Sequence, residues 1–262
     1  MTTAVKGAEG AAQAESRSGD RIRIERMRRR VRVAFNGETI GDTTRALLLL
    51  ERGHLPVYYF PRADLRVDRL RRTAHRTVCP FKGEASYWSV EVGDRVAENA
   101  AWGYERPLEE VAAIADHVAF YWDRMDRWYE EDEEVFGHPR DPYHRVDVLF
   151  SSRPVTVILG GETVAETRRA RFLFETGLPT RYYIPPEDVR TEFLVPTDTH
   201  SICPYKGRAR YWSARLSGTL YEDVVWAYDD PLPECPKIKG LMCFYNERVD
   251  RILVDGKPEA EA

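Results

Sequence analysis

The sequence predicts a mainly β protein made of two homologous antiparallel domains in tandem, with short helices. The first observation behind this prediction is an internal repeat, because TVCPFKGEASYW at 77–88 returns as SICPYKGRARYW at 201–212. The second is a series of short runs rich in β-branched and aromatic residues, separated by turn residues. The third is an Asn-Gly or Gly-Gly pair between two such runs in each copy, which is typical of a two-residue hairpin.

The two copies align without a gap over most of the chain. Gly161, Cys203 and Trp226 each lie 124 positions after their counterparts, which are Gly37, Cys79 and Trp102. We therefore expect a first repeat domain at 20–143, which includes an acidic connector at 129–143, and a second at 144–256. Residues 1–19 are expected to be a disordered leader and residues 257–262 a tail.

The elements of one copy follow in order along the chain. VRVAF at 31–35 and the run beginning at Glu38 form a hairpin across Asn36-Gly37. RALLLLERG at 45–53 fits either a short helix or a buried strand. VYYFP, ASYWSVEV and AAWGY continue as strands, and LEEVAAIADHVAF at 108–120 is the best helix candidate.

Composition excludes several classes of protein. The net charge is −4 and the pI is about 6.0, so no overall field favours nucleic acid or an anionic membrane surface. No apolar run approaches the roughly 20 residues that span a bilayer. The N-terminal stretch lacks the apolar segment of a secretory signal, and four cysteines are too few for a disulfide framework. We therefore expect a cytoplasmic protein with reduced thiols.

Alternation along the strands brings a candidate cluster together in each copy. In YWSVEV, Trp88 falls on the core face while Tyr87 and Ser89 share the other, more polar face. If the strands are neighbours, the cluster gathers around the Cys-Pro-aromatic-Lys-Gly turn. Its candidate catalytic residues are Cys79, Lys82, Cys203 and Lys206, and its candidate ligand-binding residues are Tyr59, Tyr87, Ser89, Tyr183, Tyr211 and Ser213.

A purely structural interpretation fits the same residues. Free cysteines are commonly buried as small apolar side chains, and a lysine beside a turn glycine is usually solvated. A Cys-His pair common to both copies is disfavoured, because His75 precedes its cysteine by four residues and His200 by three. No C-x-x-C pair is present, so no metal ligand is predicted. No phosphate-binding loop or dinucleotide fingerprint is present either, and no cofactor is predicted.

At these motifs the chain resembles a known family. NGETI and GGETV, YYFP and YYIPP, CPFKG and CPYKG followed by YW, and AAWGY and VVWAY are similar to the domain of unknown function 427, in its bacterial tandem form. The resemblance implies a small, strongly bent, tent-like antiparallel sheet in each domain. Members are sometimes labelled nucleotidyltransferase-like, but the carboxylates matched between the copies are scattered singly, without the paired arrangement that holds metal ions.

Two functions fit the sequence. The first is a cytoplasmic small-molecule binding or modifying protein with a pocket near the turn, whose partner is a small anionic or carbonyl-bearing ligand held by Lys82 or Lys206. The alternative is a non-enzymatic structural or interaction module in which the turn is a folding element. The sequence leaves open whether the protein is an enzyme, and it does not define the oligomeric state.

Overall fold

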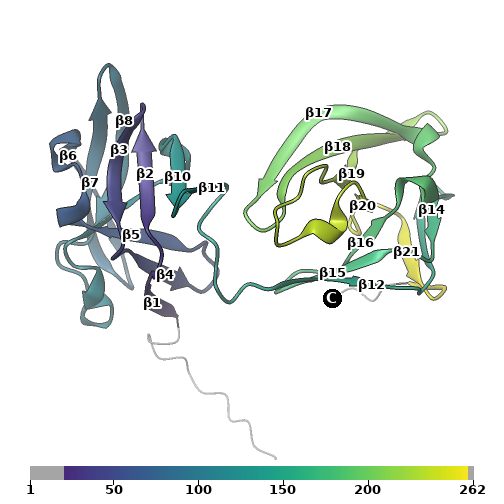
Figure 1. Cartoon of the computed structure of the whole chain (residues 1–262), viewed down its shortest axis with the longest axis horizontal. Coiled ribbons are helices and arrows are strands. Elements are labelled where there is room, and N and C mark those ends of the chain that lie inside the picture. Colours follow the sequence, from purple (N-terminus) through teal and green to yellow (C-terminus); the bar gives the residue numbers. More distant parts are fainter. Residues whose placement is uncertain (1–20, 259–262) are drawn as a thin grey trace, which may run out of the picture. The chain divides into compact units, whose positions relative to one another are not determined.

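The computed structural model describes residues 21–258, so the expected leader and residues 259–262 lie outside the described part. Two compact units divide between Glu133 and Glu134 (Figure 1). Strand β11 (Glu133–Val135), which pairs with β10, crosses this boundary, and the connector after it belongs with the second unit. Each unit contains one seven-stranded and one four-stranded antiparallel sheet, as the sequence predicts for a mainly β protein.

In the first unit the large sheet has the order β1-β4-β5-β9-β8-β7-β6 and the small sheet the order β11-β10-β2-β3. The strands are β1 (Ile22–Arg26), β2 (Val31–Phe35), β3 (Glu38–Thr43), β4 (Leu47–Glu51), β5 (Val57–Pro61), β6 (Leu70–Cys79), β7 (Gly83–Val92), β8 (Arg95–Gly103), β9 (His117–Phe120), β10 (Arg127–Glu130) and β11 (Glu133–Val135). The 3-10 helices are η2 (Arg62–Asp64), η3 (Val67–Arg69), η4 (Glu109–Ile114) and η5 (Trp122–Arg124).

The second unit repeats this topology strand for strand. Its large sheet has the order β12-β15-β16-β20-β19-β18-β17 and its small sheet the order β14-β13-β21-β22. The strands are β12 (Val146–Phe150), β13 (Val155–Leu159), β14 (Glu162–Thr167), β15 (Arg171–Glu175), β16 (Arg181–Ile184), β17 (Leu194–Cys203), β18 (Gly207–Leu216), β19 (Thr219–Ala227), β20 (Met242–Phe244), β21 (Arg251–Val254) and β22 (Lys257–Pro258). Its 3-10 helices are η6 (Pro186–Asp188), η7 (Thr191–Phe193) and η8 (Pro236–Ile238). The long β17–β18 hairpin curves along its length in Figure 1.

The predicted hairpin turns are confirmed. Phe35 pairs with Glu38 across Asn36 and Gly37, whose φ angles are 46° and 79°. Gly160 and Gly161 do the same between β13 and β14, with φ angles of 60° and 78°. Positive φ at both central positions gives the backbone twist that a two-residue hairpin needs, and glycine and asparagine adopt it at little cost.

The ambiguous leucine run at 45–53 forms strand β4, not a helix. Leu47 and Leu49 join the apolar cluster on one face of the large sheet, while Leu48 joins the cluster on the other. A strand buried on both faces needs apolar residues at every position, so its sequence does not alternate. This double burial explains why periodicity could not separate strand from helix.

The best helix candidate forms much less helix than its sequence suggests. Residues 109–114 make the 3-10 helix η4, interrupted by non-helical backbone at Val111, and the chain then enters strand β9 at His117. Val111 and Ile114 of η4 are buried against the large sheet. The apolar residues that suggested an amphipathic helix therefore lie partly in η4, which packs on the large sheet, and partly in strand β9.

Each domain has two apolar clusters, one on each face of its large sheet. In the first domain, Val31 and Val33 of the small sheet pack with Trp88 and Val90 of β7. On the opposite face, Tyr59 and other side chains pack beneath η4. The prediction that Trp88 belongs to the core is confirmed, and the tyrosine face proves to be a second core. Within the described residues 21–258, no helix is long and apolar enough to cross a membrane.

Candidate functional site

The Cys-Pro-aromatic-Lys-Gly phrase forms the turn at the end of the β6–β7 hairpin and, in the second copy, of the β17–β18 hairpin. Cys203 pairs with Gly207, and the backbone N–H of Lys206 donates to the Cys203 carbonyl at 3.4 Å. Gly207 has a φ of 102°, and a Cβ there would lie 3.4 Å from the backbone nitrogen of Leu232. Glycine is thus favoured both by the turn and by the close approach of the segment that follows β19.

The lysine of each turn is buried and paired with a glutamate. Lys206 Nζ donates to Glu175 Oε2 at 2.6 Å, and the two side chains are only 10% and 6% exposed. Lys82 donates to Glu51 in the same way. The glutamate lies 31 residues before the lysine in both copies, at the end of β4 or β15. A buried charge is normally paired, and here both copies use the same pair.

Glu175 has a second basic partner, and its pKa reflects the whole group. His144 Nε2 lies 2.9 Å from Glu175 Oε1. Burial alone would raise the pKa of Glu175, but the charge of Lys206 and the hydrogen bonds from Lys206 and His144 lower it below its ordinary value of 4.5. Glu51 also has a lowered pKa, with Lys82 and Arg21 opposing the effect of burial. Both carboxylates are therefore held in the charged form.

Connector residues cover the second turn. Arg140 Nε donates to the Pro204 carbonyl at 2.8 Å, and the Asp141 backbone N–H donates to the Tyr205 hydroxyl at 2.8 Å. The His144 ring stacks on Tyr205 at 4.4 Å between centroids. The aromatic residue of the phrase is thus a contact point for the connector in this domain.

The candidate tyrosines of β5 and β16 are core residues. Tyr59 and Tyr183 are each 1% exposed. Trp226 Nε1 donates to the Tyr183 hydroxyl at 3.1 Å, and Trp102 bonds Tyr59 in the first copy. Burial is the main cause that raises the pKa of both tyrosines well above the usual value of 10.0. These hydroxyls remain protonated and serve as buried hydrogen-bond acceptors.

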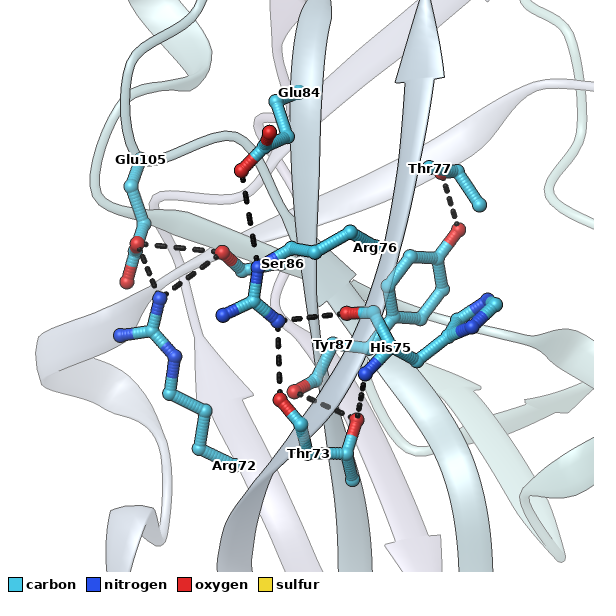
Figure 2. Close-up of polar contacts among 9 residues, drawn as sticks. All are labelled: Arg72, Thr73, His75, Arg76, Thr77, Glu84, Ser86, Tyr87 and Glu105. Carbon is cyan, nitrogen blue, oxygen red and sulfur yellow. Dashed lines mark hydrogen bonds and ion pairs between the residues drawn. The ribbon is translucent and has the colours of Figure 1, made fainter.

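The tyrosines of β7 and β18, Tyr87 and Tyr211, are buried in the second apolar cluster of their domains. Figure 2 shows the Tyr87 hydroxyl bonded to Thr77, at 2.9 Å, with the His75 ring beside the Tyr87 ring. Tyr211 bonds Ser201 at 2.6 Å in the same manner. Burial and a side-chain hydrogen bond with Tyr87 raise the pKa of Tyr121 to about 12. The hydroxyls of Tyr87 and Tyr211 thus have partners on the neighbouring strand, β6 or β17, in a buried environment.

The two candidate serines hold the backbone of a bulge. Ser89 Oγ accepts the backbone N–H of Asn99 at 3.1 Å, and Ser213 Oγ accepts that of Asp223 at 3.1 Å. Asn99 and Asp223 have positive φ angles of 49° and 45°, where the register of the β7–β8 and β18–β19 pairs shifts. An extra residue in one strand leaves a backbone N–H unpaired, and the serine hydroxyl satisfies it.

Cys79 and Cys203 are half-buried free thiols beside these clusters, and Cys235 and Cys243 are buried. Burial raises the pKa of Cys235 to about 11, which leaves that thiol protonated. The two histidines have different contacts, since His75 packs on Tyr87 and His200 Nδ1 lies 3.3 Å from the Ala209 carbonyl. Within residues 21–258 no three His, Cys, Asp or Glu side chains gather closely enough to hold a metal ion.

Carboxylates matched between the copies also have structural partners. Asp64 accepts hydrogen bonds from Thr43 and Arg45, with Arg45 Nη2 at 2.5 Å. Asp188 repeats this arrangement with Thr167 and Arg169. The paired arginine lowers the pKa of both aspartates. Each carboxylate thus ties a 3-10 helix to the small sheet.

The fold and this shared set of contacts define a protein of two like β domains, each organised around a buried lysine–glutamate pair. The chain belongs to the family described as domain of unknown function (DUF427), whose model matches residues 23–131 and again residues 147–255. No curated protein matches the chain. Sequence reasoning found the lysine and missed its glutamate, although the repetition of Glu51 as Glu175 was an available signal.

Proposed function

We propose that this protein is a non-enzymatic binding module and that the Cys-Pro-aromatic-Lys-Gly turn is a folding element in each domain. The observation that carries the proposal is the buried pair of Lys206 and Glu175, at 2.6 Å, which recurs as Lys82 and Glu51. A lysine acts as a nucleophile only when its amine is uncharged, and an adjacent carboxylate favours the charged form.

The other candidate residues support the same conclusion. Tyr183 and Ser213 have internal partners, and so do their first-copy counterparts. A ligand at the turn would have to displace Glu175 from Lys206 and leave a buried carboxylate without its main partner, which is costly. The expected small anionic or carbonyl-bearing ligand of the turn therefore stays a prediction, and recognition by exposed faces is better supported.

The charges on those faces differ between the two copies, whereas the residues that hold the turn are the same. Glu84 and Ser86 of β7 correspond to Arg208 and Arg210 of β18. Positions that hold the turn are kept, whereas exposed Glu84 becomes exposed Arg208 and buried Ser86 becomes exposed Arg210. This is the pattern of a common scaffold that carries different binding surfaces. The four free thiols suit a reducing compartment, so the proposal places the protein in the cytoplasm.

Amine labelling of the native chain tests this proposal. A short pulse of an acetylating reagent at neutral pH, followed by peptide mass spectrometry, compares Lys82 and Lys206 with Lys239, whose side chain is 66% exposed. We expect the turn lysines to react at least about tenfold more slowly than Lys239, because the reagent reaches their buried amines only when the surrounding structure opens locally. An activated lysine would react as fast as Lys239 or faster, and that result would refute the proposal.

A further inference from the structure

The first domain has a cleft of about 360 Å³ on the side of its large sheet that carries Trp88. Its lining includes Arg62 from η2, Glu105 from the segment after β8, and Asp116 and His117 at the start of β9. Its volume falls within the range of small-ligand sites in proteins. Charged groups of both signs therefore line this cleft, and Trp88, which is 2% exposed, lies beneath them.

One guanidinium in this cleft has no carboxylate partner. Arg62 lies over the Trp88 ring, with 5.1 Å from its central carbon to the ring centroid, and it forms no ion pair with any residue of the described range 21–258. Stacking on an aromatic ring orients the guanidinium and leaves its N–H edge for an oxyanion. His117 Nδ1–H donates to the Ala115 carbonyl at 2.7 Å, which leaves Nε2 for other contacts.

The same cleft offers carboxylate oxygens. Figure 2 shows Glu105 beside Arg72 and Ser86, and both contacts use the same oxygen, Oε2, at 2.7 Å and 3.3 Å. Oε1 of Glu105 accepts no hydrogen bond from the described residues. Asp116 forms no ion pair within this part of the chain either. The site thus presents acceptors for a cationic group as well as a donor for an anionic one.

The second domain lacks three of these groups at the matching positions and keeps a carboxylate, Asp229, in place of Glu105. Pro186 replaces Arg62, Gly240 replaces Asp116 and Leu241 replaces His117. Its tryptophan, Trp212, is covered by Arg210, whose guanidinium lies 4.2 Å from the ring centroid and pairs with Asp229 at 2.6 Å. Arg62, Asp116 and His117 are therefore not part of the contacts that the two domains share, because the second domain folds without them.

We propose that this cleft binds a small zwitterion of the amino-acid type. Arg62 binds the carboxylate, Glu105 and Asp116 bind the ammonium group, and the side chain of the ligand occupies the remaining space of the cleft. Glu105 already forms an ion pair with Arg72, but a simple anion would still face Asp116, and a simple cation would face Arg62. A ligand with both charges therefore suits the lining best. This inference rests on the binding role proposed above.

The test follows the indole N–H signals of the full-length chain by NMR. Each of the twenty standard free L-amino acids is added in turn at constant ionic strength, with Trp88 as the reporter and Trp212 as the control within the same molecule. We expect at least one amino acid to shift the Trp88 signal saturably without shifting Trp212. No saturable shift of Trp88, or an equal shift of Trp212, would overturn the proposal.

Two further comparisons separate a zwitterion site from a general charge effect. The first comparison uses two analogues of the best amino acid, an amine without the carboxylate and a carboxylic acid without the ammonium group, and each should bind at least about tenfold more weakly. The second uses the variants Arg62→Met and Glu105→Gln, which should bind the amino acid itself at least about tenfold more weakly. Asp229→Asn, in the second domain, is the matched control and should bind normally. Equal binding by either analogue or by Arg62→Met would overturn the proposal. Because the turn lysines are untouched, the outcome is independent of the amine labelling.

Discussion

Replacing Lys206 by methionine tests the structural role of the turn lysine. Methionine keeps most of the apolar stem but leaves Glu175 with only His144, at 2.9 Å, in a site where the carboxylate is 6% exposed. Removal of one partner from a buried ion pair costs about 3–5 kcal/mol. The retained His144 contact places the expected loss near the lower limit, at about 3 kcal/mol.

Hydrogen exchange of the native chain, resolved to peptides, measures this loss in each domain separately. A loss of about 3 kcal/mol corresponds to roughly 150-fold faster exchange of the most protected amides of β18. The equivalent amides of β7 in the first domain should be unchanged, since Lys82 is intact. Acceleration of less than about threefold in β18 would refute the claim that the pair holds the turn.

Three other outcomes follow from the same structure. The pKa of Glu175 is lowered from 4.5 on folding, so its contribution to stability is complete above that value and is lost as the pH falls through the lowered pKa. The free energy of unfolding of the second domain should therefore decline in acid, and it should decline less steeply in Glu175→Gln. Tyr183→Phe leaves the buried Trp226 N–H without its acceptor and should destabilise the second domain by about 1–3 kcal/mol in denaturant unfolding, whereas a change below the error of the fit would contradict the assignment. Gly161→Val places a β-branched residue at a φ of 78°, where nothing lies within 4 Å of its Cβ. The free energy of unfolding should therefore fall by about 1–2 kcal/mol from backbone strain alone. An unchanged stability of this variant would be inconsistent with the turn geometry.

The repeat and the strand periodicity make much of this fold predictable from the sequence. A constant spacing between matched glycines, cysteines and tryptophans establishes two like domains without any structural information. Asn36-Gly37 predicts its hairpin because few residues tolerate positive φ at both positions. Alternation also assigns Trp88 and Tyr87 to opposite faces, because the side-chain period of a strand is two.

What covers each face is not visible in a local pattern. Tyr87 was expected to face more polar surroundings, yet it packs in a second core with Ile114 of η4, which comes from a distant part of the chain. Alternation separates two faces but does not tell what packs on either. The partner of Lys206 is similarly hidden, since Glu175 comes from a strand 31 residues away. In the sequence, the only available link between them is that both residues recur in the two copies.

A double-mutant cycle on Lys206 and Glu175 tests the central claim most directly. The free energies of unfolding of Lys206→Met, Glu175→Leu and the double variant give the coupling between the two side chains. If the lysine is present to pair with the glutamate, the double variant should recover most of the stability lost in the single variants, with a coupling of about 2–3 kcal/mol. A coupling near zero, with both single losses simply additive, would contradict the account of the turn as a folding element.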